Sequence, residues 1–292
     1  MSRAPDTPTE VLRALLQTPR LHVMPCCFDG LSARLIERAG FPLTFMSGFA
    51  VSAARLGLPD TGLISYGEML DQGRNICAAV SIPVIGDADT GYGNAMNVKR
   101  TVRGYARAGF ACAMIEDQRA PKRCGHTRGK QVVGRAEALA RVRAAVDARE
   151  QGADILVMAR TDARATEGLD EALWRARAFA DAGADILFVE APASREEMKR
   201  ICAEVDAPQM ANMVEGGDTP LLPPAELEAL GYRIAAYPLT LLNGAIVAMQ
   251  DALAALARGE TPAGLLAFGA LREIVGFDAY DREQAGYAEE GE

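Results

Sequence analysis

The chain has 292 residues, of which 49% are hydrophobic, and a formal net charge of −8. That apolar content is enough to bury a large core. Basic residues are interspersed with acidic ones, which excludes the clustered basic face of a nucleic-acid-binding protein. We also expect no membrane span, because no apolar run approaches the roughly 20 residues that cross a bilayer. Since no apolar signal region follows Met1, the expected location is the cytoplasm.

A capped helix is predicted first, with Thr7 as its cap, Pro8 at its first position and Thr7-x-x-Glu10 as a capping box. Apolar strand-like runs then alternate with amphipathic helical stretches. The predicted strands cover residues 21–25, 43–47, 82–87, 111–116, 154–160, 185–190, 208–213 and 233–238. The predicted helices cover residues 30–39, 65–80, 95–108, 135–150, 169–182, 195–205, 224–230 and 240–258.

This alternation of eight strand–helix units predicts an α/β fold, the (β/α)8 TIM barrel. No linker divides the chain, so we expect residues 1–292 to form a single barrel domain that carries a C-terminal helical segment from about residue 240 to 292. The competing architecture is an open doubly wound sheet. It lacks support because no G-x-G-x-x-G motif follows the first predicted strand.

Polar residues stand where the predicted strands end, and the carboxyl ends of barrel strands form the active site in this fold. They are Ser47, Gly48, Asp87, Asp89, Glu116, Asp117, Arg160, Asp162, Glu190 and Asn212. Burying so many polar groups would destabilise a purely structural protein. We therefore expect them to converge on one functional site.

The two aspartates in Gly86-Asp87-Ala88-Asp89 indicate a metal site. Along an extended backbone, residues two apart point to the same side, and two close carboxylates repel each other unless a cation lies between them. With Glu116 they form an oxygen cage suited to Mg²⁺, with Mn²⁺ as the other option. Asp60 could act through water or behind these ligands. The alternative is that the aspartates only cap the following helix.

Substrate-binding candidates lie at other strand ends. The planar fork of Arg160 suits a substrate carboxylate, although it could instead pair with Glu190 or Asp162. Backbone N–H groups around Ser47 and Gly48 could hold an oxyanion. Glu190 and Asn212 either contact the substrate or complete the polar network.

A long loop, residues 118–133, connects a predicted strand to the next helix and is typical of a lid. It contains Cys124 next to the cationic residues Lys122 and Arg123. Cationic neighbours favour the thiolate and suit Cys124 to give or take a proton. Two alternatives are a thiol nucleophile paired with His126 and a loop thiol without a role.

Seven motifs together resemble the isocitrate lyase/PEP mutase superfamily. They are Ser47-Gly48, Leu56-Gly-Leu-Pro-Asp60, Asp87-Ala-Asp89-x-Gly-x-Gly93, Ile115-Glu-Asp-Gln118, Lys122-Arg-Cys-Gly-His126, Ala159-Arg-Thr-Asp162 and Asn212-Met-Val-Glu-Gly-Gly217. The resemblance implies a Mg²⁺-dependent barrel and a homotetramer in which residues from about 240 onward are swapped onto a neighbouring subunit. It also implies the lyase branch, with Lys122, Cys124, His126 and Arg160 catalytic, Gly125 beside the substrate, and Cys124 as the proton donor.

Departures from the resemblance narrow the expected substrate. Isocitrate and methylisocitrate lyases usually have Tyr where this chain has Phe45, and methylisocitrate lyases follow the histidine differently from Thr127-Arg-Gly-Lys130. The segment Glu215-Gly-Gly-Asp-Thr219 differs as well. Together with an apolar Phe49 near the site, these positions resemble the 2-alkylmalate and dimethylmalate lyases and favour an alkyl group over a third carboxylate.

We therefore expect a Mg²⁺-dependent carbon–carbon lyase that cleaves a 2-hydroxy dicarboxylate of the 2-alkylmalate type to a 2-oxo acid and a carboxylic acid through an enolate. Ser47-Gly48 and the metal would hold the oxo-acid half as its enolate. A 2-methylisocitrate lyase, acting on a tricarboxylate, is the nearest alternative. Others are an oxaloacetate hydrolase or decarboxylase, a carboxyphosphonoenolpyruvate phosphonomutase, and a non-catalytic dicarboxylate-binding barrel.

Overall fold

A closed ring of parallel strands forms the centre of the molecule. The structure, a computed structural model, describes residues 7–125, 127 and 129–287. Within these residues eight strands form one parallel sheet in the order β6-β5-β4-β3-β2-β1-β8-β7. The strands are β1 (His22–Cys27), β2 (Thr44–Met46), β3 (Val84–Asp87), β4 (Cys112–Glu116), β5 (Leu156–Thr161), β6 (Ile186–Val189), β7 (Met210–Asn212) and β8 (Ile234–Tyr237).

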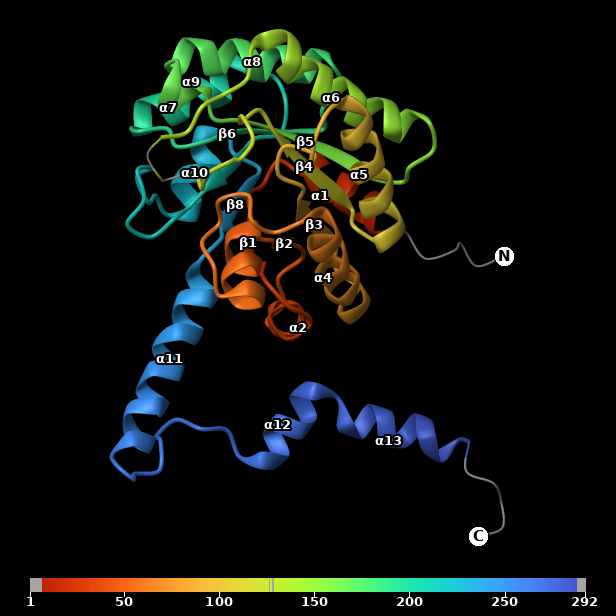
Figure 1. The fold of residues 1–292 in the computed structure, drawn as a ribbon, viewed down its shortest axis with the longest axis vertical. Coiled ribbons are helices and arrows are strands. Elements are labelled where there is room, and N and C mark those ends of the chain that lie inside the picture. Colours follow the sequence, from red (N-terminus) through yellow and green to blue (C-terminus); the bar gives the residue numbers. More distant parts are fainter. Residues whose placement is uncertain (1–6, 126, 128, 288–292) are drawn as a thin grey trace. The chain divides into compact units, whose positions relative to one another are not determined.

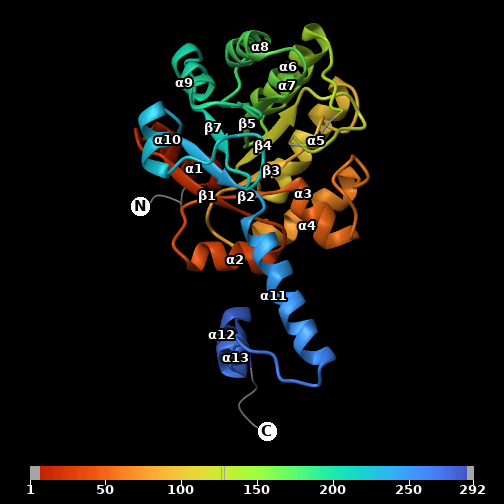
Figure 2. The ribbon, with the colours of Figure 1, turned by 90° about the vertical axis from the view of Figure 1, so that its left-hand side faces the viewer.

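A parallel bridge between Leu187 and Gln209 closes the ring, with the Leu187 N–H donating to the Pro208 carbonyl over 2.9 Å. Helices surround the strands (Figures 1 and 2), which confirms the predicted (β/α)8 barrel. In the first part of the chain they are α1 (Pro8–Gln17), α2 (Gly30–Arg38), α3 (Gly48–Val51), η1 (Ser52–Leu56), α4 (Tyr66–Ala79), α5 (Ala95–Ala108), α6 (Arg135–Glu150), α7 (Ala163–Thr166), α8 (Leu169–Asp181), α9 (Arg195–Glu204) and α10 (Pro224–Leu230).

Helix α1 begins as its sequence predicts. The Thr7 hydroxyl accepts from the Glu10 N–H over 3.3 Å, and the Glu10 carboxylate accepts from the Thr7 N–H over 2.8 Å. These two bonds complete the capping box. Leu12 of this helix is buried in the cluster that fills the barrel interior, so α1 covers one end of the barrel.

Alternation along the strands explains how the barrel interior is filled. Side chains such as Ile85, Met114, Met158, Phe188 and Met210 belong to the interior cluster. Their strand neighbours instead pack toward the surrounding helices, and each fully buried side chain contributes about 1.5–3 kcal/mol. The next inward positions, two residues further along each strand, are Asp87, Glu116, Arg160, Glu190 and Asn212. The same period of two that builds the apolar interior therefore places a layer of polar groups at its carboxyl end.

The chain divides into two units, residues 1–242 and 243–292, a boundary close to the expected start of the C-terminal segment. The helices from this boundary onward are α11 (Thr240–Ala257), α12 (Phe268–Val275) and α13 (Phe277–Ala285). Several large apolar side chains on α11 are exposed, among them Met249, Leu253 and Leu256. Seating on a neighbouring subunit stays a prediction.

Helix α11 corrects one expectation from the sequence. Among the described residues it is the one helix long and apolar enough, by length and composition, to cross a membrane. We had expected no such run. The reason for the difference is that Asn243, Gln250 and Asp251 interrupt the apolar run without lowering its mean hydropathy far enough. Core helices of soluble proteins have the same length and composition, so this feature alone assigns no membrane.

Candidate active site

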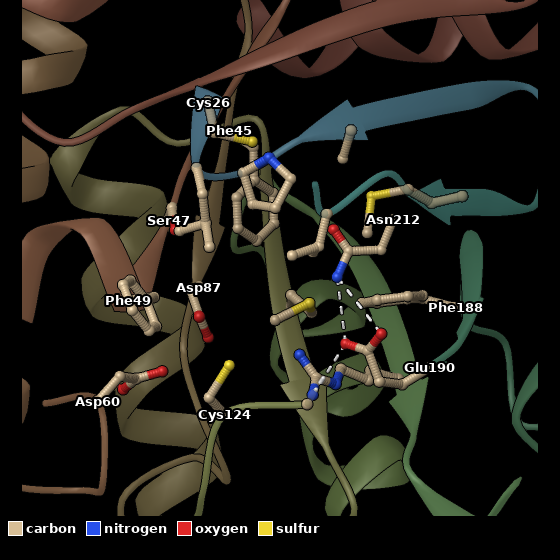
Figure 3. A pocket seen from close by; sticks show the side chains of 18 of the residues that line it. Cys26, Phe45, Ser47, Phe49, Asp60, Asp87, Cys124, Phe188, Glu190 and Asn212 are labelled. Carbon is tan, nitrogen blue, oxygen red and sulfur yellow. Dashed lines mark hydrogen bonds and ion pairs between the residues drawn. The ribbon is translucent and has the colours of Figure 1, made fainter. Parts of the chain in front are cut away.

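A pocket opens at the carboxyl ends of the strands (Figure 3). It has an apolar floor and a charged wall. The floor includes Cys26, Phe45, Met114, Phe188 and Met210. The charged and polar lining residues are Ser47, Asp60, Asp87, Lys122, Arg123, Arg160, Glu190 and Asn212. This combination suits a small anionic ligand that also carries apolar groups.

One part of the wall, which we call the acidic half, consists of Asp60, Asp87, Asp89, Glu116 and Lys122. Strand β3 ends at Asp87, and the backbone of Asp89 has a φ of 49°. The prediction that Asp87 and Asp89 converge because they alternate along an extended strand is therefore wrong, since the backbone turns at Asp89. The turn is closed by the Asp89 N–H, which donates to Asp87 Oδ1 over 3.0 Å.

The Asp87 carboxylate also fixes the loop after β2. The Gly48 N–H donates to Asp87 Oδ2 over 3.2 Å, and a Cβ atom at Gly48 would lie 2.5 Å from that oxygen. Glycine is therefore required here. The Ser47 N–H donates to the Cys27 carbonyl over 3.1 Å, so the N–H groups of both Ser47 and Gly48 already have acceptors. The oxyanion role expected for them stays a prediction.

Lys122 lies among the carboxylates of the acidic half. Its Nζ is 2.6 Å from Asp60 Oδ1 and 2.8 Å from Asp89 Oδ1, and its side chain is buried. Burial by itself disfavours the ammonium, but the nearby carboxylates, led by Asp89 and Asp87, outweigh burial and raise the pKa of Lys122 well above its ordinary value. Lys122 is therefore a fixed cation of the pocket wall.

Carboxylates nevertheless outnumber cations in the acidic half. Burial, reinforced by the charge of Asp89, raises the pKa of Asp87 to about 6. Burial also raises the pKa of Glu116 well above its ordinary value, against the opposing effect of Arg160. Four carboxyl groups thus face the ammonium of Lys122 and, at Glu116 alone, the Arg160 Nε at 3.4 Å, an arrangement that favours an additional cation or proton.

The other part of the wall, the guanidinium half, consists of Arg160, Asp162, Glu190 and Asn212. Arg160 donates from Nε to Asp162 Oδ2 over 2.8 Å and from Nη2 to Asp162 Oδ1 over 3.0 Å. Its Nη2 also pairs with Glu190 Oε2 at 3.1 Å, and Asn212 Nδ2 donates to both Glu190 oxygens over 3.3 Å. The ion pairs expected as the alternative role of Arg160 are therefore present.

These contacts still leave Arg160 able to bind a ligand. Within the described residues, hydrogen bonds and ion pairs of Arg160 involve Nε and Nη2 but not Nη1. Arg160 lines the pocket. A guanidinium held rigidly by two carboxylates, with one nitrogen unused, is suited to bind a carboxylate in a defined orientation.

The loop between β4 and α6 lies against the pocket. An antiparallel bridge joins Gln118 and Val132 at its base. Near its middle, Cys124 is half-buried and lines the pocket, with its side chain directed toward the strand ends (Figure 3). A Cβ atom at Gly125 would lie 2.6 Å from Arg160 Nη2, so only glycine fits at that close approach. His126, predicted as catalytic, lies outside the described residues.

Comparison with known proteins identifies the family. The family model described as phosphoenolpyruvate phosphomutase matches residues 12–257. The chain is 46% identical to the 2,3-dimethylmalate lyase of Eubacterium barkeri, over 95% of this chain and 97% of that one. A crystal structure of 2,3-dimethylmalate lyase, described as a PEP mutase/isocitrate lyase superfamily member, matches with a TM-score of 0.93 at 38% identity, covering 98% and 97% of the two chains. The chain belongs to the PEP mutase/isocitrate lyase superfamily.

Two further members of the superfamily bear on the chemistry. Oxaloacetate acetylhydrolase in complex with 3,3-difluorooxalacetate matches with a TM-score of 0.93 at 36% identity, covering 98% and 99% of the chains. Phosphonopyruvate hydrolase in complex with oxalate and Mg²⁺ matches with a TM-score of 0.86 at 30% identity, covering 97% and 99%. The predicted superfamily is confirmed, and the lyase relatives agree with the predicted enzyme class.

The acidic half of this superfamily member fits a hard divalent cation. Among the described residues, Glu116 Oε1 is buried without a hydrogen-bond or ion-pair partner. Asp60 Oδ1 and Asp89 Oδ1 are buried with Lys122 Nζ as their partner, and oxygen ligands are what Mg²⁺ and Mn²⁺ prefer. Within the described residues no three carboxylate, thiol or imidazole groups form a ready-made metal cluster. Lys122 is the reason in part, because its ammonium lies between Asp60 and Asp89.

Three further buried charged residues support the site. Asp117 was expected there as a polar residue at a strand end, whereas Lys130 and Arg175 were not. Asp117 accepts from the Asp162 N–H over 2.9 Å and pairs with Arg175 at 3.0 Å. Lys130 pairs with Asp162 at 3.3 Å and donates to the Gly125 carbonyl. The position of Asp117 at the end of a predicted strand, directly after Glu116, was the signal that identified it. Lys130 in a loop and Arg175 on a helix give no such signal in the sequence.

Proposed function

We propose that this superfamily member is a Mg²⁺-dependent carbon–carbon lyase that cleaves a 2-hydroxy dicarboxylate of the 2-alkylmalate type to a 2-oxo acid, such as pyruvate, and a carboxylic acid. One observation carries the proposal. The Cys124 thiol enters a pocket that has an excess of carboxylates on one side and the open Nη1 of Arg160 on the other. The similarity to 2,3-dimethylmalate lyase over nearly the whole chain supports the substrate class.

Asp87, Asp89 and Glu116 would hold the metal, with Asp60 acting through water. Mg²⁺ or Mn²⁺ would supply positive charge that polarises the oxygen substituents of the substrate. The unpartnered Glu116 Oε1 and the raised pKa of Asp87 support this assignment, because a bound cation would pair with that oxygen and stabilise the ionised Asp87 carboxylate.

Other residues of the pocket bind the substrate and exclude water. Arg160 binds one substrate carboxylate through Nη1, with Glu190 and Asn212 holding the guanidinium in place. Phe45 and Phe49 contact the alkyl substituent and exclude water. Gly125 permits the close approach of the loop to Arg160, and Lys122 links Asp60 and Asp89 through ion pairs with both carboxylates.

Bond cleavage begins when a general base in the pocket takes the proton of the substrate hydroxyl. The oxygen electron pair forms the carbonyl of the 2-oxo acid, and the electrons of the C2–C3 bond leave with C3. Cys124 then gives its thiol proton to C3, which completes the carboxylic acid. The enolate charge therefore develops on the departing acid and not, as the sequence analysis expected, on the oxo-acid half.

A substrate panel tests the proposal. We would measure 2-oxo-acid release from 2-methylmalate, 2,3-dimethylmalate, 2-methylisocitrate, isocitrate and oxaloacetate, with and without Mg²⁺. Cleavage of the alkylmalates is expected, and Cys124→Ser should lower it by about 10²–10⁴-fold because the general acid is replaced. Cys202→Ser, at a thiol remote from the pocket lining, is the control. Absence of alkylmalate cleavage would refute the assignment.

Oxaloacetate hydrolysis is the second candidate, because the structural match to oxaloacetate acetylhydrolase has the same TM-score as the match to the lyase. Release of oxalate and acetate from oxaloacetate, with alkylmalates unreactive, would establish it. Reaction of 2-methylisocitrate alone would show that Phe45 and Phe49 do not restrict the pocket to alkylmalates.

We also propose that the enzyme is a homotetramer whose C-terminal helices contact neighbouring subunits. The apolar side chains exposed on α11 and α12, including Leu253, Leu256 and Phe268, support this because such surface favours association. Light scattering should give a mass of four chains for the wild type and a lower mass for Leu253→Glu. A monomeric wild type would contradict the assembly.

A further inference from the structure

Lys130 is a buried cation that the proposed chemistry does not use. It stands near the end of the loop that carries Cys124, yet its side chain is only 5% exposed. Its Nζ donates to the Gly125 carbonyl and pairs with Asp162 Oδ1 at 3.3 Å. Burying an ammonium costs free energy unless charged or polar partners compensate. Both partners of Lys130 belong to the site.

The contact between Lys130 and the Gly125 carbonyl affects the position of the Cys124 thiol. Gly125 follows Cys124 directly and lies against Arg160 and Glu190 so closely that a Cβ atom would not fit. A hydrogen bond from Lys130 to the Gly125 carbonyl holds Gly125, the residue next to Cys124, in place. Lys130 therefore holds the segment that carries the thiol at the strand ends.

The contact between Lys130 and Asp162 affects the charge balance at the Arg160 guanidinium. Asp162 is fully buried, and its carboxylate accepts hydrogen bonds from both Nε and Nη2 of Arg160. Its backbone N–H donates to Asp117, and the two hydrogen bonds from Arg160 orient its carboxylate. Because Lys130 shares Asp162 Oδ1 with Arg160, Asp162 neutralises Arg160 less completely. More positive potential is then left at Nη1 for a ligand carboxylate.

We propose that Lys130 is a positioning residue that couples the two ends of the reaction, the proton donor Cys124 and the carboxylate anchor Arg160, without touching substrate. The inference rests on the proposed function for its catalytic consequences, but its structural consequence stands independently. Loss of Lys130 should make the segment that carries the Cys124 thiol more mobile and should also weaken the binding of a ligand carboxylate by Arg160.

The first experiment needs no substrate. The rate of iodoacetamide alkylation at Cys124 would be followed by peptide mass spectrometry in wild type, Lys130→Met and Lys130→Arg. We expect several-fold faster alkylation in Lys130→Met, because the Gly125 peptide is no longer held, and a return toward the wild-type rate in Lys130→Arg. The control is Arg119→Met in the same loop, whose side chain is exposed and should leave the rate unchanged.

The second experiment separates positioning from general structure. With the alkylmalate that the wild type cleaves, Lys130→Met should lower kcat by about 10- to 100-fold, the effect of a small misplacement of a catalytic group. It should also raise KM, because the anchor is weakened. Lys130→Gln, which removes the charge with a polar side chain, replaces Lys130→Met if thermal melting shows that the methionine variant does not fold.

The outcomes distinguish the two proposals. Wild-type alkylation, kcat and KM in a folded Lys130→Met variant would overturn the role of Lys130 and leave the lyase assignment intact. Changed Cys124 alkylation together with a wild type that cleaves no alkylmalate would refute the lyase assignment and support the structural part of the inference.

Discussion

Around the ends of β3 and β4, four carboxyl groups face the single ammonium of Lys122, whereas Arg160 at the end of β5 is matched by Asp162 and Glu190. Even with the 3.4 Å pair between Arg160 Nε and Glu116 Oε2, the acidic half has fewer positive than negative groups, and Glu116 Oε1 is buried without a partner among the described residues. The guanidinium half is nearly complete as it stands. The comparison indicates that one half is built to receive a cation and the other to hold a fixed cation in position for an anion.

Removing one carboxylate from the acidic half should give the largest effect. We expect Glu116→Gln to lower kcat/KM by roughly 10³-fold, because several kcal/mol of charge stabilisation depend on the metal. Without metal its melting temperature should not fall, since burial already raises the pKa of Glu116 well above its ordinary value. The rise in melting temperature on adding Mg²⁺ should shrink. Glu150→Gln, on the surface, is the control, and an undiminished Mg²⁺ effect would contradict the assignment.

Replacing the cation of the guanidinium half should give a smaller and different effect. Arg160→Lys keeps the charge but loses the fork, so we expect KM for the dicarboxylate to rise by about 10- to 100-fold, the equivalent of one charge-assisted hydrogen bond. The Mg²⁺-dependent shift in melting temperature should remain. Arg164→Lys, which alters the partly buried pair with Glu197 outside the pocket lining, serves as the comparison. A loss confined to kcat would show that Arg160 does not anchor substrate.

Changing the apolar wall should alter selectivity more than rate. Phe49 is half-buried at the pocket, so Phe49→Ala should enlarge the space for the alkyl group. We expect the ratio of kcat/KM for 2,3-dimethylmalate to that for 2-methylisocitrate to fall by about tenfold, which is within the discrimination of an apolar contact. Leu31→Ala, at an exposed position, should leave the ratio unchanged. An unchanged ratio for Phe49→Ala would exclude this residue from substrate selection.

The smallest effect lies far from both halves, at the start of β1. His22 Nε2 contacts the Thr18 hydroxyl at 2.9 Å and the Leu15 carbonyl at 3.1 Å, and burial lowers its pKa below 6.5. The folded protein then resists the proton that the unfolded chain accepts, so stability is lost as the pH falls below about 6.5. Between about pH 7.5 and 5.5, denaturant titration should show a larger loss of stability for wild type than for His22→Gln. Equal losses would contradict the shift.

The elements were predictable because their signals are local. Every predicted strand and helix boundary falls within two residues of the observed one, since apolar periodicity and caps such as Thr7 depend on neighbouring residues. The short helices α3 and α7 were missed because four residues are too few to show a period. The C-terminal helices α12 and α13 were expected only as a helical segment.

The sequence predicted which residues form the site better than it predicted how their side chains are arranged. Inward positions at the strand ends follow from a period of two, which identified Asp87, Glu116, Arg160, Glu190 and Asn212. The left-handed backbone at Asp89 was not predicted, because aspartate seldom adopts it without the turn that Asp87 closes. Lys130 was missed because its two partners are brought to it only by the path of the loop.

The sequence by itself determined the barrel, its polar carboxyl end and the resemblance to a metal-dependent lyase branch, because periodicity, caps and motif order are properties of short segments. Only the tertiary structure decided which charges pair. Lys122 reaches Asp60, 62 positions away along the chain, and Thr161 reaches Asp117 across 44 positions. Electrostatic interactions depend on distance and burial in space, and neither quantity is written in the spacing of residues along the chain.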